Sequence, residues 1–153
     1  MQVAIPPDKG LESHRGTVRS LLGAGGPTNT ILESGAFILG AAGVVISAAI
    51  HLHLWDTGYS DIKTIGPLFL AQSIVGFCLA AMLIILRRLW VAALCFGYLL
   101  STITGFLLSV NVGLFGFQDT WSAPFASAAF WDEFGACVLL LAGGALCAVD
   151  ALS

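Results

Sequence analysis

The chain has 153 residues, of which 58% are hydrophobic and only 10% are charged. Its mean hydropathy is +0.93. A soluble domain usually carries about 25% charged residues, so this composition excludes a disordered chain and argues against a water-soluble domain. The net charge of -3 offers no basic surface for phosphate groups, and we expect no nucleic-acid partner.

The first 30 residues are polar and end in a glycine-rich break at residues 23–27. Their ionisable side chains are Asp8, Lys9, Glu12, His14, Arg15 and Arg19. A secretory signal would place a short apolar core directly after its basic start, whereas the first apolar stretch here is long enough to be a full span. We therefore expect a flexible cytoplasmic tail over residues 1–30, followed by a first span that is retained.

Four apolar stretches follow, at about residues 31–55, 65–86, 89–113 and 123–149. Each reaches the roughly 20 residues that a helix needs to cross a hydrocarbon core about 30 Å thick. Barrel strands are excluded because they alternate over roughly 10 residues, whereas these stretches are uniformly apolar. The sequence predicts an all-α fold, an integral membrane up-and-down four-helix bundle over residues 31–153, with Pro67 and Pro124 in first helical turns.

Basic residues are distributed unequally between the two sides of these spans. Five belong to the tail or to the turn between spans two and three, namely Lys9, Arg15, Arg19, Arg87 and Arg88, and only Lys63 belongs to the other side. By the positive-inside rule, both termini and the Arg87–Arg88 turn face the cytoplasm. We expect a multi-pass protein of a bacterial plasma membrane in this orientation.

Small residues recur at four-residue spacing on the first span. Ala36 with Gly40, and Gly43 with Ser47, form small-xxx-small pairs. Such pairs let a second helix approach closely, so they indicate helix packing without identifying the partner.

Six polar side chains are expected near the outer ends of the spans. Counting about 20 residues along each helix from its cytoplasmic end places five of them near one level and Gln72 about 9 Å below the boundary. The set is His51, His53, Gln72, Asn111, Asp132 and Glu133. In a bundle these side chains could converge on a functional cavity, because acids at this depth are costly unless they find a partner. Alternatively they are interfacial, in the headgroup region or joined as an acid–histidine pair.

Metal and cofactor sites are not expected. His51 and His53 point about 200° apart on a helix, which prevents chelation of one ion, and the third histidine, His14, belongs to the opposite side of the membrane. The four cysteines, Cys78, Cys95, Cys137 and Cys147, contain no C-x-x-C pair and are interpreted as ordinary buried residues. No nucleophile, phosphate-loop or zinc-protease motif is present, so we predict no catalytic residue and no enzyme activity.

One sequence pattern carries a resemblance. It runs from His51-Leu52-His53-Leu54-Trp55 through Gly58-Tyr59 to Ile65-Gly66-Pro67-Leu68-Phe69-Leu70 and Gln72, with Gly113-Leu114-Phe115-Gly116-Phe117 further on. This pattern resembles a group of small four-span bacterial membrane proteins of the actinobacterial type. The resemblance covers the chain from the first span to the start of the fourth. It implies no activity, and it directs attention to the outer loop between spans one and two.

Two functional classes are compatible with these features. The first is a non-enzymatic accessory or scaffold subunit that binds other membrane proteins, or a second copy of itself, through small-residue helix faces. The second is a small transporter or ligand-binding membrane protein that uses the outer polar cluster. The orientation of Asp132 and Glu133, toward the bundle interior or toward headgroups, distinguishes the two.

Overall fold

A computed structural model describes residues 31–152. Four long helices account for most of this part, α2 (Ile31–Leu54), α3 (Ile65–Leu86), α4 (Leu89–Val112) and α5 (Ala126–Leu152). A short π-helix, η1 (Trp55–Tyr59), continues α2. The predicted all-α fold is confirmed, whereas the predicted tail over residues 1–30 lies outside the described residues.

All four helices are long and apolar enough to cross a bilayer, over Ile31–Tyr59, Ile65–Leu86, Leu89–Val112 and Ala126–Ala148. Their outward faces carry large hydrophobic side chains such as Leu39, Ile85 and Leu141, each more than half exposed. A soluble monomer rarely exposes apolar surface on this scale, and hydrocarbon is the solvent that suits it. The chain therefore has the character of a multi-pass integral membrane protein.

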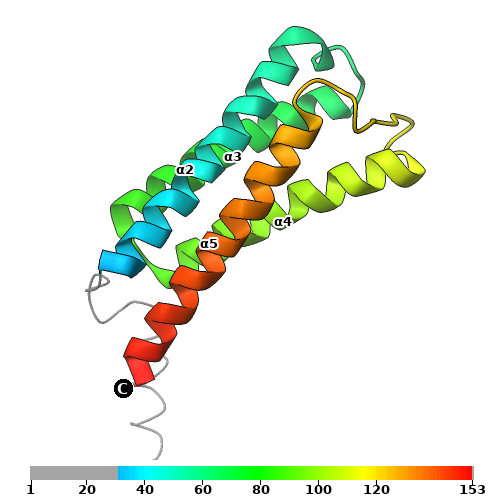
Figure 1. Ribbon diagram of the computed structural model, residues 1–153. Helices are drawn as coiled ribbons and strands as arrows, with labels where there is room; N and C mark the ends of the chain where they lie inside the picture. Colours follow the sequence, from blue (N-terminus) through cyan, green and yellow to red (C-terminus); the bar gives the residue numbers. More distant parts are fainter. Residues whose placement is uncertain (1–30, 153) are drawn as a thin grey trace, which may run out of the picture.

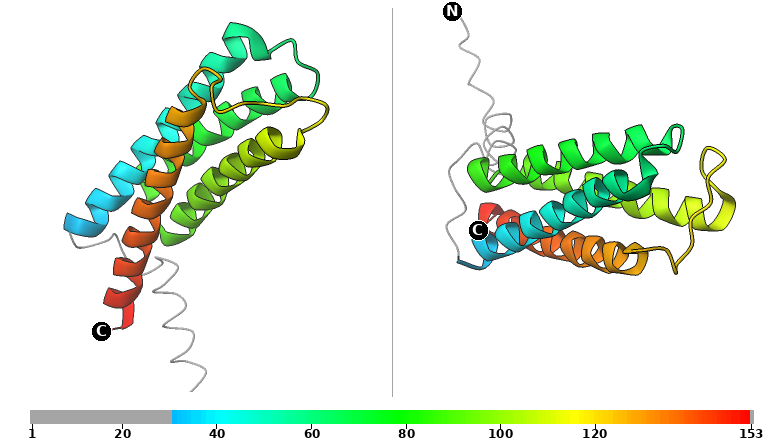
Figure 2. Two further views of the ribbon diagram at one scale, coloured as in Figure 1. Left: turned by 45° about the vertical axis from the view of Figure 1, so that its right-hand side comes forward. Right: turned by 90° about the horizontal axis from the view of Figure 1, so that it is seen from above.

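The helices form an up-and-down bundle in which each packs against its neighbours in the chain and α5 returns to α2 (Figure 1). One end of the bundle holds the tight Arg87–Arg88 connection and is called the turn end. The opposite end holds the longer connections, residues 60–64 and 113–125, and is called the loop end. Figure 2 shows the second of these connections crossing from α4 to α5 at the loop end.

Helix boundaries differ from the sequence prediction in two places. The first helix does not stop near Trp55 but widens into the π-turn η1, in which the Ser60 N–H donates to the Trp55 carbonyl. Gly58 adopts φ 152° there, a conformation that disfavours any side chain. The last helix begins at Ala126, so Pro124 precedes this helix. Our prediction that Pro124 occupies the first turn of the helix was wrong.

Small residues bring α2 and α5 into close contact along their length. A Cβ added at Gly40 would lie 2.6 Å from the Leu140 side chain, and one at Gly43 would lie 2.5 Å from the Ala136 Cβ. The contacts form a regular antiparallel series, Ala36 with Gly143, Gly40 with Leu140, Gly43 with Ala136, and Ser47 with Glu133. We call this series the α2–α5 seam. The small-xxx-small pairs of the first span are therefore used inside this chain.

The turn-end half of the bundle is filled by apolar side chains. Leu83, Val91 and Leu99 are completely buried there, together with Val44 and Cys95. With Ala136 and Leu140 of α5 they make a continuous core across all four helices. Polar side chains instead gather in the loop-end half, where the site described next is found.

Candidate functional site: a polar and aromatic cavity at the loop end

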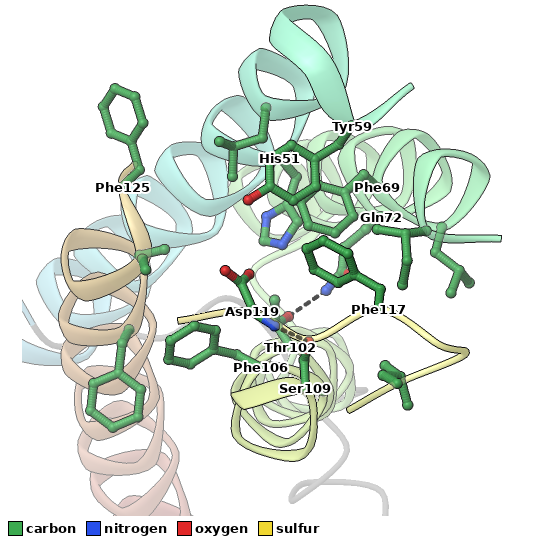
Figure 3. A pocket seen from close by; sticks show the side chains of 18 of the residues that line it. His51, Tyr59, Phe69, Gln72, Thr102, Phe106, Ser109, Phe117, Asp119 and Phe125 are labelled. Carbon is green, nitrogen blue, oxygen red and sulfur yellow. Dashed lines mark hydrogen bonds between the residues drawn. The ribbon is translucent and has the colours of Figure 1, made fainter. Parts of the chain in front are cut away.

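A cavity of about 120 Å³ lies between the four helices at the loop end (Figure 3). Three residues of the predicted polar cluster line it, His51 from α2, Gln72 from α3 and Glu133 from α5. Its other polar lining residues are Tyr59, Ser101, Thr102, Ser109 and Asp119. The tertiary structure thus brings together side chains that are up to 82 residues apart in the sequence (133 minus 51).

Ser47 fixes two buried polar side chains of this cavity, Glu133 and His51. Its hydroxyl donates to Glu133 Oε1 over 2.7 Å, and its carbonyl oxygen lies 2.8 Å from His51 Nδ1. Glu133 is 2% exposed and His51 is 7% exposed, so both are held inside the bundle. Because a carbonyl can only accept, Nδ1 must carry a proton, and in the neutral ring Nε2 is then an acceptor.

A second polar chain links α3 to α4 on the opposite wall. The Gln72 amide donates through Nε2 to Thr102 Oγ1, and the Thr102 hydroxyl donates to the Tyr98 carbonyl over 2.9 Å. With its nitrogen engaged, Gln72 keeps its amide oxygen as an acceptor. The dashed bond between Gln72 and Thr102 in Figure 3 marks this wall.

Aromatic rings cover the mouth of the cavity. Tyr59 stacks on Phe69 with ring centroids 5.0 Å apart, and Phe117 meets Tyr59 edge-on at 5.7 Å. The ring centroids of His51 and Phe69 are also 5.0 Å apart, on the same side of the cavity. The π-turn places Tyr59 in this cluster because the extra residue per turn, permitted by Gly58, rotates the end of the helix.

Asp119 is a site residue that the sequence analysis did not select. It belongs to the connection between α4 and α5, is half-buried and lines the cavity. Its N–H donates to the Ser109 hydroxyl over 3.1 Å, and Figure 3 shows its carboxylate directed inward toward His51. The sequence signal that could have identified Asp119 is its position two residues after Gly113-Leu114-Phe115-Gly116-Phe117. That position alone does not predict that the loop folds back and brings Asp119 to the cavity.

The remaining predicted residues lie elsewhere. His53 is exposed and meets Phe125 edge-on at 5.3 Å, and Asn111 is exposed and donates to the Leu107 carbonyl of its own helix. Asp132 is half-buried, with Oδ1 3.7 Å from the position of a Cβ on Gly43, and it does not line the cavity. Its Oδ2 is buried without a hydrogen-bond partner. The predicted cluster therefore separates into three cavity residues and three others.

Neither of the two acids of the predicted cluster is paired with a histidine, and the described residues form no metal-binding group. Over residues 31–152 no ion pair joins a histidine to either acid, because Ser47 takes the place that we had assigned to an imidazole. Among the same residues no three His, Cys, Asp or Glu side chains gather as a metal site. No disulfide joins two cysteines of the described residues; Cys95 and Cys137 are buried, Cys147 is half-buried and Cys78 is exposed.

No family model, curated protein or solved structure matches this chain. The resemblance to four-span bacterial proteins stays a prediction, and the function must be inferred from the geometry of the cavity.

Proposed function

We propose that this chain is a ligand-binding membrane protein that holds a small molecule in the loop-end cavity. The observation that carries the proposal is the convergence of His51, Gln72 and Glu133, from three helices, on one cavity of about 120 Å³. Small-molecule sites combine an apolar wall with a few converging polar groups, and this cavity has that composition. Its polar groups are positioned by bonds to Ser47 and Thr102, so the site is preformed.

The cavity is a binding site rather than an open channel. Toward the turn end it is followed by the apolar core around Leu83 and Leu99, neither of which has any exposed surface. This closely packed apolar core therefore blocks the passage of a polar molecule from the cavity toward the turn end. Transport would require a second arrangement of the helices, whereas binding requires only the arrangement described here.

The accessory or scaffold function has less support from the geometry. The small residues that favoured it, Gly40 and Gly43 above all, are covered by α5 of the same chain. The exposed apolar helix faces that remain are equally suited to lipid. Co-purification of a stoichiometric membrane-protein partner in mild detergent would favour this second function.

We also propose that the protein lies in a bacterial plasma membrane with its loop end outside. The turn end carries Arg87 and Arg88, whereas Lys63 is the one basic residue of the connections at the loop end. Under the positive-inside rule this distribution puts the cavity on the side away from the cytoplasm.

The binding proposal is tested by filling the cavity. Gly105 lines it from α4, and a Cβ added there meets no atom within 4 Å, so Gly105→Leu introduces its side chain through open space and adds bulk to the cavity wall. Gly97→Leu is the matched control, because Gly97 is on the same helix, is equally open and lies away from the cavity. The purified proteins are heated in detergent with a panel of small cations, anions and neutral molecules.

A ligand that binds only the folded state raises the unfolding temperature. We expect at least one class in the panel to raise it for the wild type and for Gly97→Leu, and to leave Gly105→Leu unchanged. The proposal is wrong if no class stabilises the wild type, or if Gly105→Leu responds as strongly as the control.

A further inference from the structure

We infer that the ligand of the loop-end cavity is a small protonated amine. This inference rests on the proposed binding function and adds the chemical class of the ligand. Three independent properties of the cavity wall support it: its charge, its hydrogen-bonding capacity and its aromatic surface.

The charged groups of the wall are acidic. Asp119 and Glu133 both line the cavity, and no lysine or arginine is among its lining residues. A cation moved out of water into a membrane protein needs an opposite charge beside it. This wall provides two carboxyl groups, whereas it offers an anionic ligand no lysine or arginine.

The hydrogen-bonding groups of the wall are mainly acceptors. His51 uses Nδ1–H on the Ser47 carbonyl and so offers Nε2, and Glu133 has only Oε1 engaged by the Ser47 hydroxyl. Among the described residues the hydrogen bond of the Glu133 carboxyl group is to Oε1, and that of the Gln72 amide is from Nε2, so Oε2 and the amide oxygen are available as acceptors. An ammonium group has donors and no acceptor, and it therefore matches this wall.

The aromatic rings add a third attraction. Tyr59, Phe69 and Phe117 form one contact cluster at the mouth, and Phe106 and Phe130 lie 6.4 Å apart on the opposite side. The faces of such rings attract cations. A metal ion would gain little from them, and no set of three metal-binding side chains accompanies them in the described residues.

The volume limits the size of the amine. An apolar cavity of about 150 Å³ accommodates benzene, which has six non-hydrogen atoms. The present cavity, at about 120 Å³, is therefore suited to an alkylammonium ion of about five non-hydrogen atoms. A larger amine would exceed this volume.

The test compares molecules of one size and different charge, each with five non-hydrogen atoms. Full-length protein in mild detergent is titrated with tert-butylammonium, tert-butanol and propionate at constant ionic strength, and binding is followed by the shift in unfolding temperature. We expect tert-butylammonium to bind at least tenfold more tightly than the other two. Tetramethylammonium, which has no N–H donor, should also bind at least tenfold more weakly.

Glu133→Gln should weaken tert-butylammonium binding at least tenfold. Asp132→Asn is the matched control, since it makes the same chemical change one residue away at a side chain that does not line the cavity, and its binding should stay within threefold of the wild type. Asp119→Asn, in the connection between α4 and α5, gives a second test should Glu133→Gln fail to fold, and it should also weaken binding.

Two results would overturn the amine assignment. One is preferential binding of propionate or tert-butanol that is lost in Gly105→Leu, in which case the cavity binds a ligand of another class and the proposed function survives. The other is unchanged affinity for tert-butylammonium in both Glu133→Gln and Asp119→Asn. Absence of binding by every molecule of the panel would instead overturn the proposed function itself.

Discussion

At the scale of single residues, Ser47 organises the cavity through two different groups. Its hydroxyl holds Glu133, and its carbonyl orients His51 one helical turn further along α2. In the sequence Ser47 is notable only as a small residue at a packing position. A small hydroxyl residue lets α5 approach and also supplies a donor to the buried acid, so packing and polar positioning are combined in one side chain.

We predict that Ser47→Ala removes the donor to Glu133 without moving His51, whose partner is a backbone atom. Leaving a buried carboxyl group without its hydrogen bond should lower the free energy of unfolding by about 1–2 kcal/mol. Affinity for tert-butylammonium should change as well, because Glu133 is then free to shift. Both effects can be measured by unfolding in detergent with and without the amine.

Thr104→Val is the control for this variant. Thr104 is exposed and does not line the cavity, and its hydroxyl donates to the Leu100 carbonyl of its own helix, so this substitution removes a hydroxyl group but no bond between helices. Its loss should cost less than about 0.5 kcal/mol. Equal effects of the two substitutions would show that the Ser47–Glu133 bond contributes nothing specific.

At the scale of helices, the α2–α5 seam determines which residues face the cavity. The glycines allow the two backbones to approach, and Ser47 and Glu133 continue the same series into the loop-end half. This register sets the rotation of α5. It turns Glu133 into the bundle while its neighbour Asp132 lies against α2 beside Gly43.

We predict that a small residue is needed on only one side of the seam at the level of Gly43. Gly43→Ala should destabilise the bundle by about 1–3 kcal/mol, because the new Cβ would lie 2.5 Å from the Ala136 Cβ. The double variant Gly43→Ala with Ala136→Gly moves the methyl group across the contact and should recover most of that stability. Unfolding in detergent of the two single variants and the double variant measures the coupling.

Gly35→Ala serves as the control on the same helix, since a Cβ there meets nothing within 4 Å. It should be neutral or slightly stabilising, because alanine favours a helix by roughly 1 kcal/mol over glycine. Additive losses in the Gly43→Ala and Ala136→Gly double variant would contradict a close contact at this level.

At the scale of the whole molecule, the placement of the two bundle ends decides which compartment the cavity samples. The described helices alternate in direction, so residues 60–64 and 113–125 share one side and the Arg87–Arg88 turn lies on the other. In the orientation that we propose from the asymmetry of basic residues, the loop end and its cavity face away from the cytoplasm.

We predict that a reporter active only outside the cytoplasm works when fused after Tyr59 or Gln118. The same reporter should be inactive after Arg88 or Ser153, because these positions belong to the turn end and the carboxyl terminus. Fusion activities normalised to expression give the comparison. Activity after Arg88 would reverse the orientation and place the cavity on the cytoplasmic side.

The sequence by itself determined the number and nature of the helices. A backbone in lipid must satisfy its own hydrogen bonds, and each apolar stretch has the length of one helical span, so four helices follow from composition and spacing. Local chemistry also separated His51 from His53, since a helix points residues two apart in nearly opposite directions.

Only the tertiary structure decided how each helix is rotated and which polar residues meet. Lipid is as apolar as the bundle core, so the burial of hydrophobic side chains does not choose one face of a uniformly apolar helix. That choice depends on close contacts such as Gly43 with Ala136 and on single bonds such as Ser47 to Glu133. Asp119 enters the cavity only because its loop folds back, and no periodicity in the sequence encodes that return.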